Sequence, residues 1–257
     1  MQGTICGLFH YPVKGLSAQP LDMVDLVAGQ GFPFDRVFGF ARPDSGFDPE
    51  NPKPLPKTKF VVLARDAALA TLMTHFDPQT GCLKILKQGK TYQFDLAKPE
   101  GRMDAAALLT EHLAFPADMQ PTLYSADPHR FTDVSVVSPA MMNAVSLINL
   151  DSVAAFSETL GYHISPARFR GNIHFSGLPP FSELDLTDRI LEIGDVRLKV
   201  VMRTKRCPAT EVDPLTGARD HDVPSLLRAY YGHSDMGVYA EVQRAGRIRP
   251  GDALRLL

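Results

Sequence analysis

The sequence predicts a mainly β protein of the α+β class. Most of its apolar stretches are short, rich in β-branched and aromatic side chains, and bounded by Gly, Pro, Asn or Asp. This pattern is typical of a barrel or sandwich rather than of alternating strands and helices. Stretches with helical periodicity are few. The 257 residues are 44% hydrophobic and 22% charged, which excludes a disordered chain and suffices for one large domain or two modest ones.

Strands are predicted where such apolar runs lie between turn residues. In chain order they cover residues 4–9, 21–27, 37–40, 60–64, 83–86, 91–96, 134–137, 144–148, 172–175, 190–193, 196–202, 209–212, 237–242 and 253–256. They are spread over the whole chain, so strands are expected to supply most of the core.

Four stretches are predicted as helices. Residues 66–76 and 104–113 carry leucines at spacings that gather them on one helix face. Residues 149–161 end at Gly161, and glycine suits the left-handed position that follows a helix. Residues 224–231 are the fourth stretch.

Two proline-rich regions divide the chain. Residues 42–59 contain five prolines and almost nothing apolar, so we predict a loop there. A second break in composition, marked by Pro116, Pro121 and Pro128, separates a predicted helix from the strands that follow. We therefore place a domain boundary near residue 125, with one domain over 1–125 and the other over 126–257.

The overall charge excludes several classes of partner. Lys and Arg number 27 against 29 Asp and Glu, a net charge of −2, which favours neither nucleic acid nor an anionic membrane. No stretch approaches the ~20 apolar residues of a membrane-spanning helix, and the N-terminus lacks the basic start of a signal peptide. Three cysteines are too few for a disulfide framework. We therefore expect a cytoplasmic protein with no nucleic-acid partner and no membrane partner.

The most informative segment covers residues 203–217, in which an apolar strand runs into cations around one thiol. Lys205 and Arg206 directly precede Cys207. Neighbouring cations stabilise a thiolate, which is both a soft metal ligand and a good nucleophile, so metal binding and sulfur chemistry are both open. Cations give a purely structural cysteine no advantage. Cys207 is therefore the candidate metal ligand and catalytic residue.

A second basic feature follows the third predicted helix. Arg168 and Arg170 flank an aromatic residue there, and Asn172 adds an amide. The planar guanidinium group suits phosphate. Lys14 and Arg36 also lie near the ends of predicted strands, where loops converge. Together with the thiol, these residues indicate an anionic, phosphate-bearing cofactor beside a thiolate.

These residues lie in or directly beside motifs that resemble the MOSC family. The motifs are Tyr-Pro-Val-Lys-Gly-Leu from residue 11, Asp-Arg from residue 35, Phe-Arg-Gly-Asn-Ile from residue 169 and Arg-Cys-Pro-Ala-Thr-Glu-Val-Asp-Pro-Leu-Thr-Gly from residue 206. More narrowly, the chain resembles proteins that join an N-terminal MOSC-type β-barrel domain to a MOSC domain, as the amidoxime-reducing components do. The resemblance implies an N-terminal β-barrel-like domain plus a MOSC β-barrel with a few peripheral helices.

The resemblance also implies a molybdenum–molybdopterin cofactor, with Cys207 as the protein ligand to molybdenum. The implied cofactor-binding residues are Lys14, Arg36, Arg168, Arg170, Asn172, Lys205 and Arg206. Among them, Arg170 and Asn172 would hold the pterin and its phosphate. Two positions depart from the family pattern: Lys205 replaces a small polar residue, and Gly171 replaces a proline, which is expected to loosen the turn.

The implied activity is the molybdenum-cofactor-dependent reduction of small N-oxygenated (N-hydroxylated) compounds. Three cysteines do not supply the four ligands of an iron–sulfur cluster. Electrons are therefore expected from a separate donor protein, which would be a reductase, a ferredoxin-like protein or a haem carrier. Two alternatives stay open. Cys207 could carry a persulfide, since MOSC domains also occur at the end of cofactor sulfurases, or the protein could carry the molybdenum cofactor without turnover.

Overall fold

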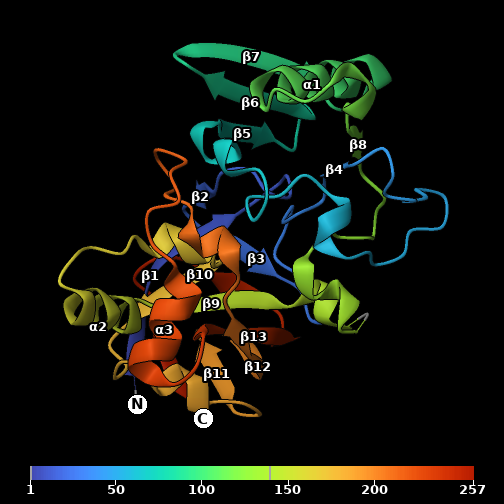
Figure 1. The fold of residues 1–257 in the computed structure, drawn as a ribbon. Coiled ribbons are helices and arrows are strands. Elements are labelled where there is room, and N and C mark those ends of the chain that lie inside the picture. The colour runs from blue at the N-terminus through green and yellow to red at the C-terminus, as the bar shows by residue number, and fades with distance from the viewer. Residues whose placement is uncertain (1, 139) are drawn as a thin grey trace.

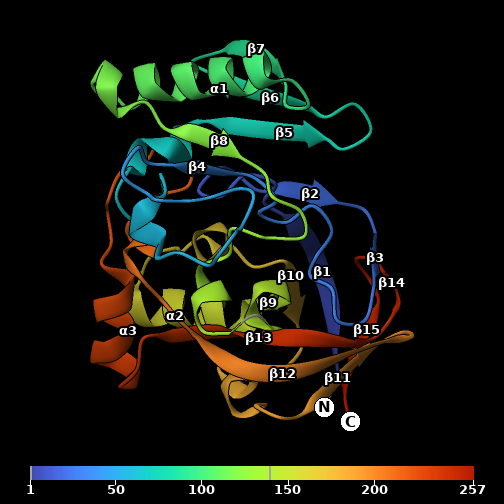
Figure 2. The same cartoon turned by 90° about the vertical axis from the view of Figure 1, so that its right-hand side faces the viewer.

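The computed structural model describes residues 2–138 and 140–257, and strands dominate it (Figure 1). This confirms the mainly β class. Over these residues the α-helices number three, α1 (Pro99–His112), α2 (Leu150–Leu160) and α3 (Val223–Tyr231), and they lie outside the sheets (Figures 1 and 2). Within the same residues, no helix has the length and apolar character needed to cross a membrane.

The largest feature of the fold is a closed barrel. Among the described residues its seven strands are β1 (Gln2–His10), β9 (Val145–Asn149), β10 (Ile173–Ser176), β11 (Ile190–Ile193), β12 (Val196–Lys205), β13 (Asp235–Arg244) and β15 (Ala253–Leu256). Their order is β10-β9-β13-β12-β11-β15-β1, and the pairing of β1 with β10 closes the barrel. A short strand, β2 (Gln19–Leu21), pairs with β1. The first strand of the chain thus completes a barrel whose other strands all follow residue 144.

Every second side chain along the barrel strands points inward, and these side chains fill the barrel interior. In β12, Val196, Leu198 and Val200 are buried, whereas Arg197 and Lys199 between them are partly exposed. This is the two-residue period of a strand with one face inward. The inward side chains of β1 join those of the later strands in one apolar cluster, and burial of this surface is the main force that stabilises the barrel.

Smaller open sheets lie outside the barrel. A three-stranded antiparallel sheet contains β5 (Met73–Asp77), β6 (Cys82–Lys87) and β7 (Lys90–Asp95), and α1 lies over it (Figure 2). Two further antiparallel pairs are β4 (Gly39–Ala41) with β8 (Thr122–Tyr124), and β3 (Val24–Leu26) with β14 (Gly246–Ile248). The region predicted as the N-terminal domain thus supplies open sheets as well as β1 of the barrel. The boundary near residue 125 stays a prediction.

Three of the four predicted helices are confirmed. The helix α2 ends before Gly161, which has the expected left-handed backbone (φ 74°), and α1 begins earlier than predicted, at Pro99. The helix predicted over 66–76 is wrong, because a short 3-10 helix, η2 (Ala67–Thr71), is followed by β5. Pairing with β6 overrides the helical spacing and leaves Met73 64% exposed.

Several predicted strands are also wrong. Residues 134–137 and 209–212 lie mostly in the 3-10 helices η4 (Asp133–Val136) and η8 (Pro208–Glu211). In η8, Pro208 stands at the first helical position, where its fixed φ favours a helical turn. Residues 60–64 form only an isolated bridge between Phe60 and Ala41, and 21–27 is divided between β2 and β3.

The loop predicted over 42–59 is confirmed, except that it ends in the 3-10 helix η1 (Lys57–Lys59). The other short 3-10 helices are η3 (Ala117–Met119), η5 (Ala140–Asn143), η6 (Pro166–Phe169) and η7 (Ser182–Asp185). Of these, η6 carries the second predicted basic feature.

Packing explains why residue 171 is a glycine, which the sequence did not reveal. A Cβ atom at this position would lie 2.4 Å from the side chain of Ile148, which is buried in β9. The expectation that glycine merely loosens this turn is therefore replaced by a steric one: the close approach to β9 requires a residue without a side chain.

Candidate functional site

One cavity of about 230 Å³ is lined by every predicted site residue. These residues are Lys14, Arg36, Arg168, Arg170, Asn172, Lys205, Arg206 and Cys207. They come from three separate parts of the chain: the N-terminal loops, the segment between α2 and β10, and the segment where β12 ends. The fold therefore brings them together, while their roles as cofactor ligands stay predictions.

Cys207 lies in the turn that follows β12. The backbone N–H of Arg206 donates to the carbonyl of Ser234 (2.8 Å), and the Cys207 carbonyl accepts from both the N–H and the hydroxyl of Thr210 (3.0 and 2.9 Å). Pro208 then starts η8. These contacts hold the partly exposed Cys207 in the wall of the cavity.

Arg168 supports the segment that follows Cys207. Its side chain is 2% exposed, and its Nη1 donates to two carbonyls of η8 (3.3 and 3.1 Å). Its Nη2 pairs with Asp220 (2.6 Å) and Asp213 (3.2 Å), and its Nε has no hydrogen-bond partner within the described part of the chain. These contacts favour a positioning role for Arg168, in place of the direct cofactor contact that the sequence analysis predicts.

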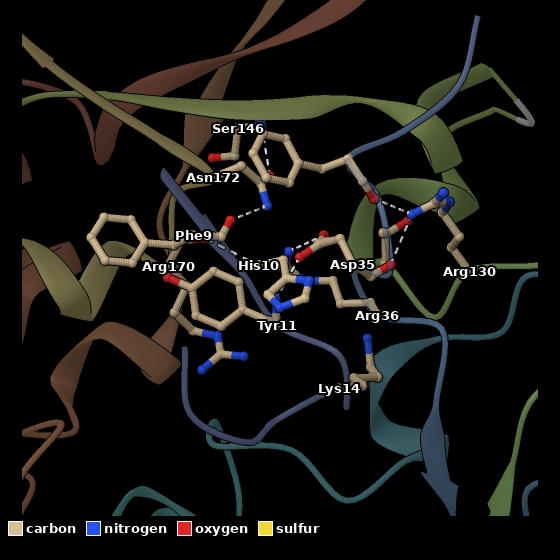
Figure 3. A network of polar contacts seen from close by, with 12 residues as sticks. Phe9, His10, Tyr11, Lys14, Asp35, Arg36, Arg130, Ser146, Arg170 and Asn172 are labelled. Carbon is tan, nitrogen blue, oxygen red and sulfur yellow. Dashed lines mark hydrogen bonds and ion pairs between the residues drawn. The ribbon is translucent and has the colours of Figure 1, made fainter. Parts of the chain in front are cut away.

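Arg36 and Arg170 lie against the ring of Tyr11 (Figure 3). Their guanidinium carbons are 4.6 and 4.3 Å from the ring centroid. Arg36 also pairs with Asp35, and Nη1 of Arg170 donates to the carbonyl of Leu16 at 2.8 Å. One aromatic ring thus holds two guanidinium groups close together through cation–π contacts.

Asn172 and Lys14 are committed to contacts within the fold. The Asn172 side chain accepts a hydrogen bond from the Ser146 N–H (3.0 Å) and donates one to the Phe9 carbonyl (3.1 Å), which ties β9 and β1 together next to β10 (Figure 3). Nζ of Lys14 donates to a backbone carbonyl at 2.8 Å and pairs with Asp133. Part of the hydrogen-bonding capacity of each group therefore remains for a ligand.

The cavity has an excess of positive charge. Within the described residues, its lining includes eight cationic side chains and two carboxylates, Asp35 and Asp133. The cations are Lys14, Arg36, Lys57, Arg168, Arg170, Arg203, Lys205 and Arg206. Burial lowers the pKa of Arg170 to about 10, and it lowers the pKa of Arg206 to about 10 as well. Because buried cations without enough carboxylates are unfavourable, a bound anion would stabilise this wall of the cavity.

Lys57 is a site residue that the sequence did not identify. It enters the cavity from the proline-rich loop, and its Nζ lies 3.8 Å from Oδ2 of Asp133. Burial would lower the pKa of Lys57, but its interactions with Cys207 and Asp133 outweigh this and raise it. The sequence offered no signal beyond one cation in a proline-rich loop, because tertiary contacts determine the path of such a loop.

Acidification is expected to destabilise the protein through His174, which lies beside the site. His174 is 8% exposed, and its Nε2 has no hydrogen-bond partner in the residues that the structure describes. Burial, followed by the charge of Arg206, lowers the pKa of His174 from 6.5 to about 4. The unfolded chain therefore binds a proton at His174 more tightly than the folded protein does. Stability that is fully present above pH 6.5 is lost as the pH falls through 4, and the free energy of unfolding decreases by about 3 kcal/mol in total.

Denaturant titrations between about pH 7 and 4 measure this loss. His174→Gln removes the titrating group, so its free energy of unfolding should fall less over this range. The exposed His163 provides the matched control, and His163→Gln should keep the wild-type pH dependence. Equal slopes for the wild type and His174→Gln would contradict the prediction.

Comparison with known proteins adds a family and a set of relatives. Residues 128–255 match the family model of the MOSC domain. The human mitochondrial amidoxime-reducing component 1 is 30% identical over 154 residues, which cover 54% of this chain and 45% of that protein. The molybdenum cofactor sulfurase of Caenorhabditis elegans is 36% identical over 97 residues, covering 36% of this chain and 13% of the sulfurase. The chain thus spans less than half the length of these curated relatives.

Two solved structures align with the chain, both with a TM-score below 0.5. The YuaD protein from Bacillus subtilis aligns with 100% of this chain and 96% of its own, at 13% identity and a TM-score of 0.47. YiiM from Geobacillus stearothermophilus aligns with 44% of this chain and 53% of its own, at 21% identity and a TM-score of 0.36.

Proposed function

The chain belongs to the MOSC family, and from this premise we propose that it binds a molybdenum–molybdopterin cofactor around Cys207 and reduces N-oxygenated compounds. One observation carries the proposal: a partly exposed thiol lies in a cavity where, among the described residues, cationic side chains far outnumber carboxylates. Relatives named as amidoxime-reducing components support it.

The residues present fit such a cofactor. A thiolate is a soft ligand that suits molybdenum. The guanidinium groups of Arg36 and Arg170, held on Tyr11, would bind the phosphate. Arg206 donates through Nε to the carbonyl of Met236 at 2.8 Å, which keeps its charge in the wall of the cavity. The anionic cofactor would also supply the counter-charge that the buried arginines lack.

When bound, the cofactor supplies the two-electron chemistry that removes oxygen from nitrogen. The overall change converts an N-hydroxyl compound, two electrons and two protons into the N–H compound and water. The chain's own residues bind the cofactor and orient the groups around it. Arg168 and Thr210 fix the turn that presents Cys207, and Asn172 fixes the neighbouring barrel strands. Because these groups are already in position, the site needs less structural reorganisation during the reaction.

We propose that the electrons come from a separate redox protein, either a reductase, a ferredoxin-like protein or a haem carrier. The cytoplasmic location also stays a prediction. Artificial donors can replace this partner in a test, so the activity can be examined before the partner is identified.

Metal analysis and a reduction assay test the proposal. Protein made in a host that synthesises the cofactor should contain about one molybdenum per chain, because the cavity offers one thiolate ligand. With a reduced viologen dye as electron donor, it should convert benzamidoxime to benzamidine. Metal-free protein from such a host would contradict the cofactor assignment, and metal without turnover across a panel of N-hydroxylated substrates would indicate a cofactor carrier.

Sulfur transfer is the second candidate function. The match to a molybdenum cofactor sulfurase favours it, since the Cys207 thiol could then carry a persulfide. Intact-protein mass spectrometry would detect an additional sulfur atom on Cys207. A persulfide in protein that lacks molybdenum would replace the reductase proposal with this one.

A further inference from the structure

Two lysines beside Cys207 differ from the other cations of the cavity. Lys205 is exposed, and it forms no ion pair with any residue in the described ranges. Lys57 is about one-third exposed, lines the cavity together with Cys207 and is 3.8 Å from Asp133. By contrast, Lys14 and Arg36 are well buried and paired with carboxylates. The two lysines therefore form a solvent-accessible cationic rim of the cavity, separate from its buried wall.

A buried hydroxyl lies next to this rim. Thr204 precedes Lys205, is 3% exposed and lines the same cavity. Its Oγ1 has no hydrogen-bond partner over the residues that the structure describes. Buried hydroxyl groups are nearly always hydrogen-bonded, so the Thr204 hydroxyl has hydrogen-bonding capacity that a group bound in the cavity can use.

Arg203 does not contribute to the rim, although it lines the cavity. Its Nε donates to the carbonyl of Leu184 (2.7 Å), and its Nη2 pairs with Asp185 (2.8 Å). Its charge is therefore compensated within the protein. Among the solvent-accessible cations next to Cys207, Lys205 has no carboxylate partner in the described residues, and Lys57 shares Asp133 with Lys14.

We propose that Lys57, Lys205 and Thr204 form a subsite for an anionic group, such as a carboxylate, on the N-oxygenated substrate. Two ammonium groups and a hydroxyl donor suit a small oxygen anion. Their place beside Cys207 would direct the uncharged N–O end of the substrate toward the metal site. The inference rests on the proposed reductase function and specifies its substrate class: N-hydroxylated compounds that carry a negative charge.

The experiment compares 4-carboxybenzamidoxime with uncharged benzamidoxime, using holoenzyme and a viologen dye as electron donor. The measured quantity is the ratio of kcat/KM for the charged and the uncharged substrate. In Lys57→Gln and in Lys205→Gln this ratio should fall about fivefold, as expected for the loss of one partly solvated ion pair. Lys53→Gln removes an exposed charge from the same loop outside the cavity, and it should keep the wild-type ratio.

Calorimetry gives a second readout that does not need turnover. Without an electron donor, the Kd of the holoenzyme for 4-carboxybenzamidoxime should rise by a similar factor in both cavity variants. An unchanged ratio and Kd in both variants would overturn the subsite. A parallel loss of molybdenum in these variants would overturn it too, because the lysines would then serve the cofactor.

The two proposals can fail separately. If the wild type reduces neither amidoxime, the reductase proposal fails, and the calorimetric comparison still decides the subsite. If it reduces both with equal efficiency and binds them equally well, only the subsite fails.

Discussion

Replacement of Cys207 by alanine is expected to lower the reduction of N-hydroxylated substrates to below about 1% of the wild type, a larger loss than removal of a supporting residue produces. Cys207 is the thiol that lines the cavity, whereas Cys6 and Cys82 lie on β1 and β6 and do not line it. Alanine retains the extended backbone of residue 207 but offers no ligand. Steady-state rates with a viologen dye, normalised to protein concentration, measure the effect.

Molybdenum and pterin contents separate the possible causes of this loss. The contacts proposed for Arg36 and Arg170 do not involve sulfur, so Cys207→Ala should retain part of the pterin while losing activity. Cys82→Ala is the matched control, because it removes a thiol from the sheet outside the barrel, and it should retain both activity and metal. Wild-type turnover by Cys207→Ala would contradict the assignment of Cys207 as metal ligand.

Gly237→Ala is expected to destabilise the fold by about 3 kcal/mol or more. Gly237 has a left-handed backbone (φ 75°), and a Cβ there would lie 2.3 Å from the carbonyl oxygen of Leu147. It stands where β13 holds one extra residue opposite the segment between Arg203 and Lys205. Such a bulge changes the direction of the backbone. The carbonyl of Met236, the residue before Gly237, accepts hydrogen bonds from Arg206.

The free energy of unfolding from denaturant titration measures this effect. Gly232→Ala is the matched control, since Gly232 has almost the same φ (77°) but open space around its Cβ position. It should lose only about 1 kcal/mol, the contribution of the left-handed backbone alone. Equal losses for the two variants would show that the close approach to Leu147 has no energetic consequence.

Local patterns were sufficient for much of the fold. The strands 190–193 and 253–256 have the predicted bounds, and α2 ends where Gly161 indicated. Predictions were wrong where long-range pairing or a turn overrode a local signal. The leucine spacing over 66–76 suited a helix, yet β6 pairs with residues 73–77, and Pro208 turned a predicted strand into a 3-10 helix.

The candidate site shows the same division. The motifs and the residues directly beside them include all eight predicted residues, and the structure brings all eight to one cavity. The motifs gave no indication that Arg168 uses its guanidinium group on the turn after Cys207, or that Asn172 uses its amide between strands. They also missed Lys57, whose loop reaches the cavity only through contacts distant in sequence.

The sequence by itself determined the mainly β class, the places of three of the four predicted helices and the chemistry available at the site, because periodicity, turn residues and side-chain charge act locally. Tertiary structure alone decided which of those side chains remain free for a ligand. Closure of the barrel by β1 and β10 and ion pairs such as that between Lys14 and Asp133 join residues more than a hundred positions apart. The partners of a buried charge, and hence the energy of leaving it unpaired, depend on those contacts.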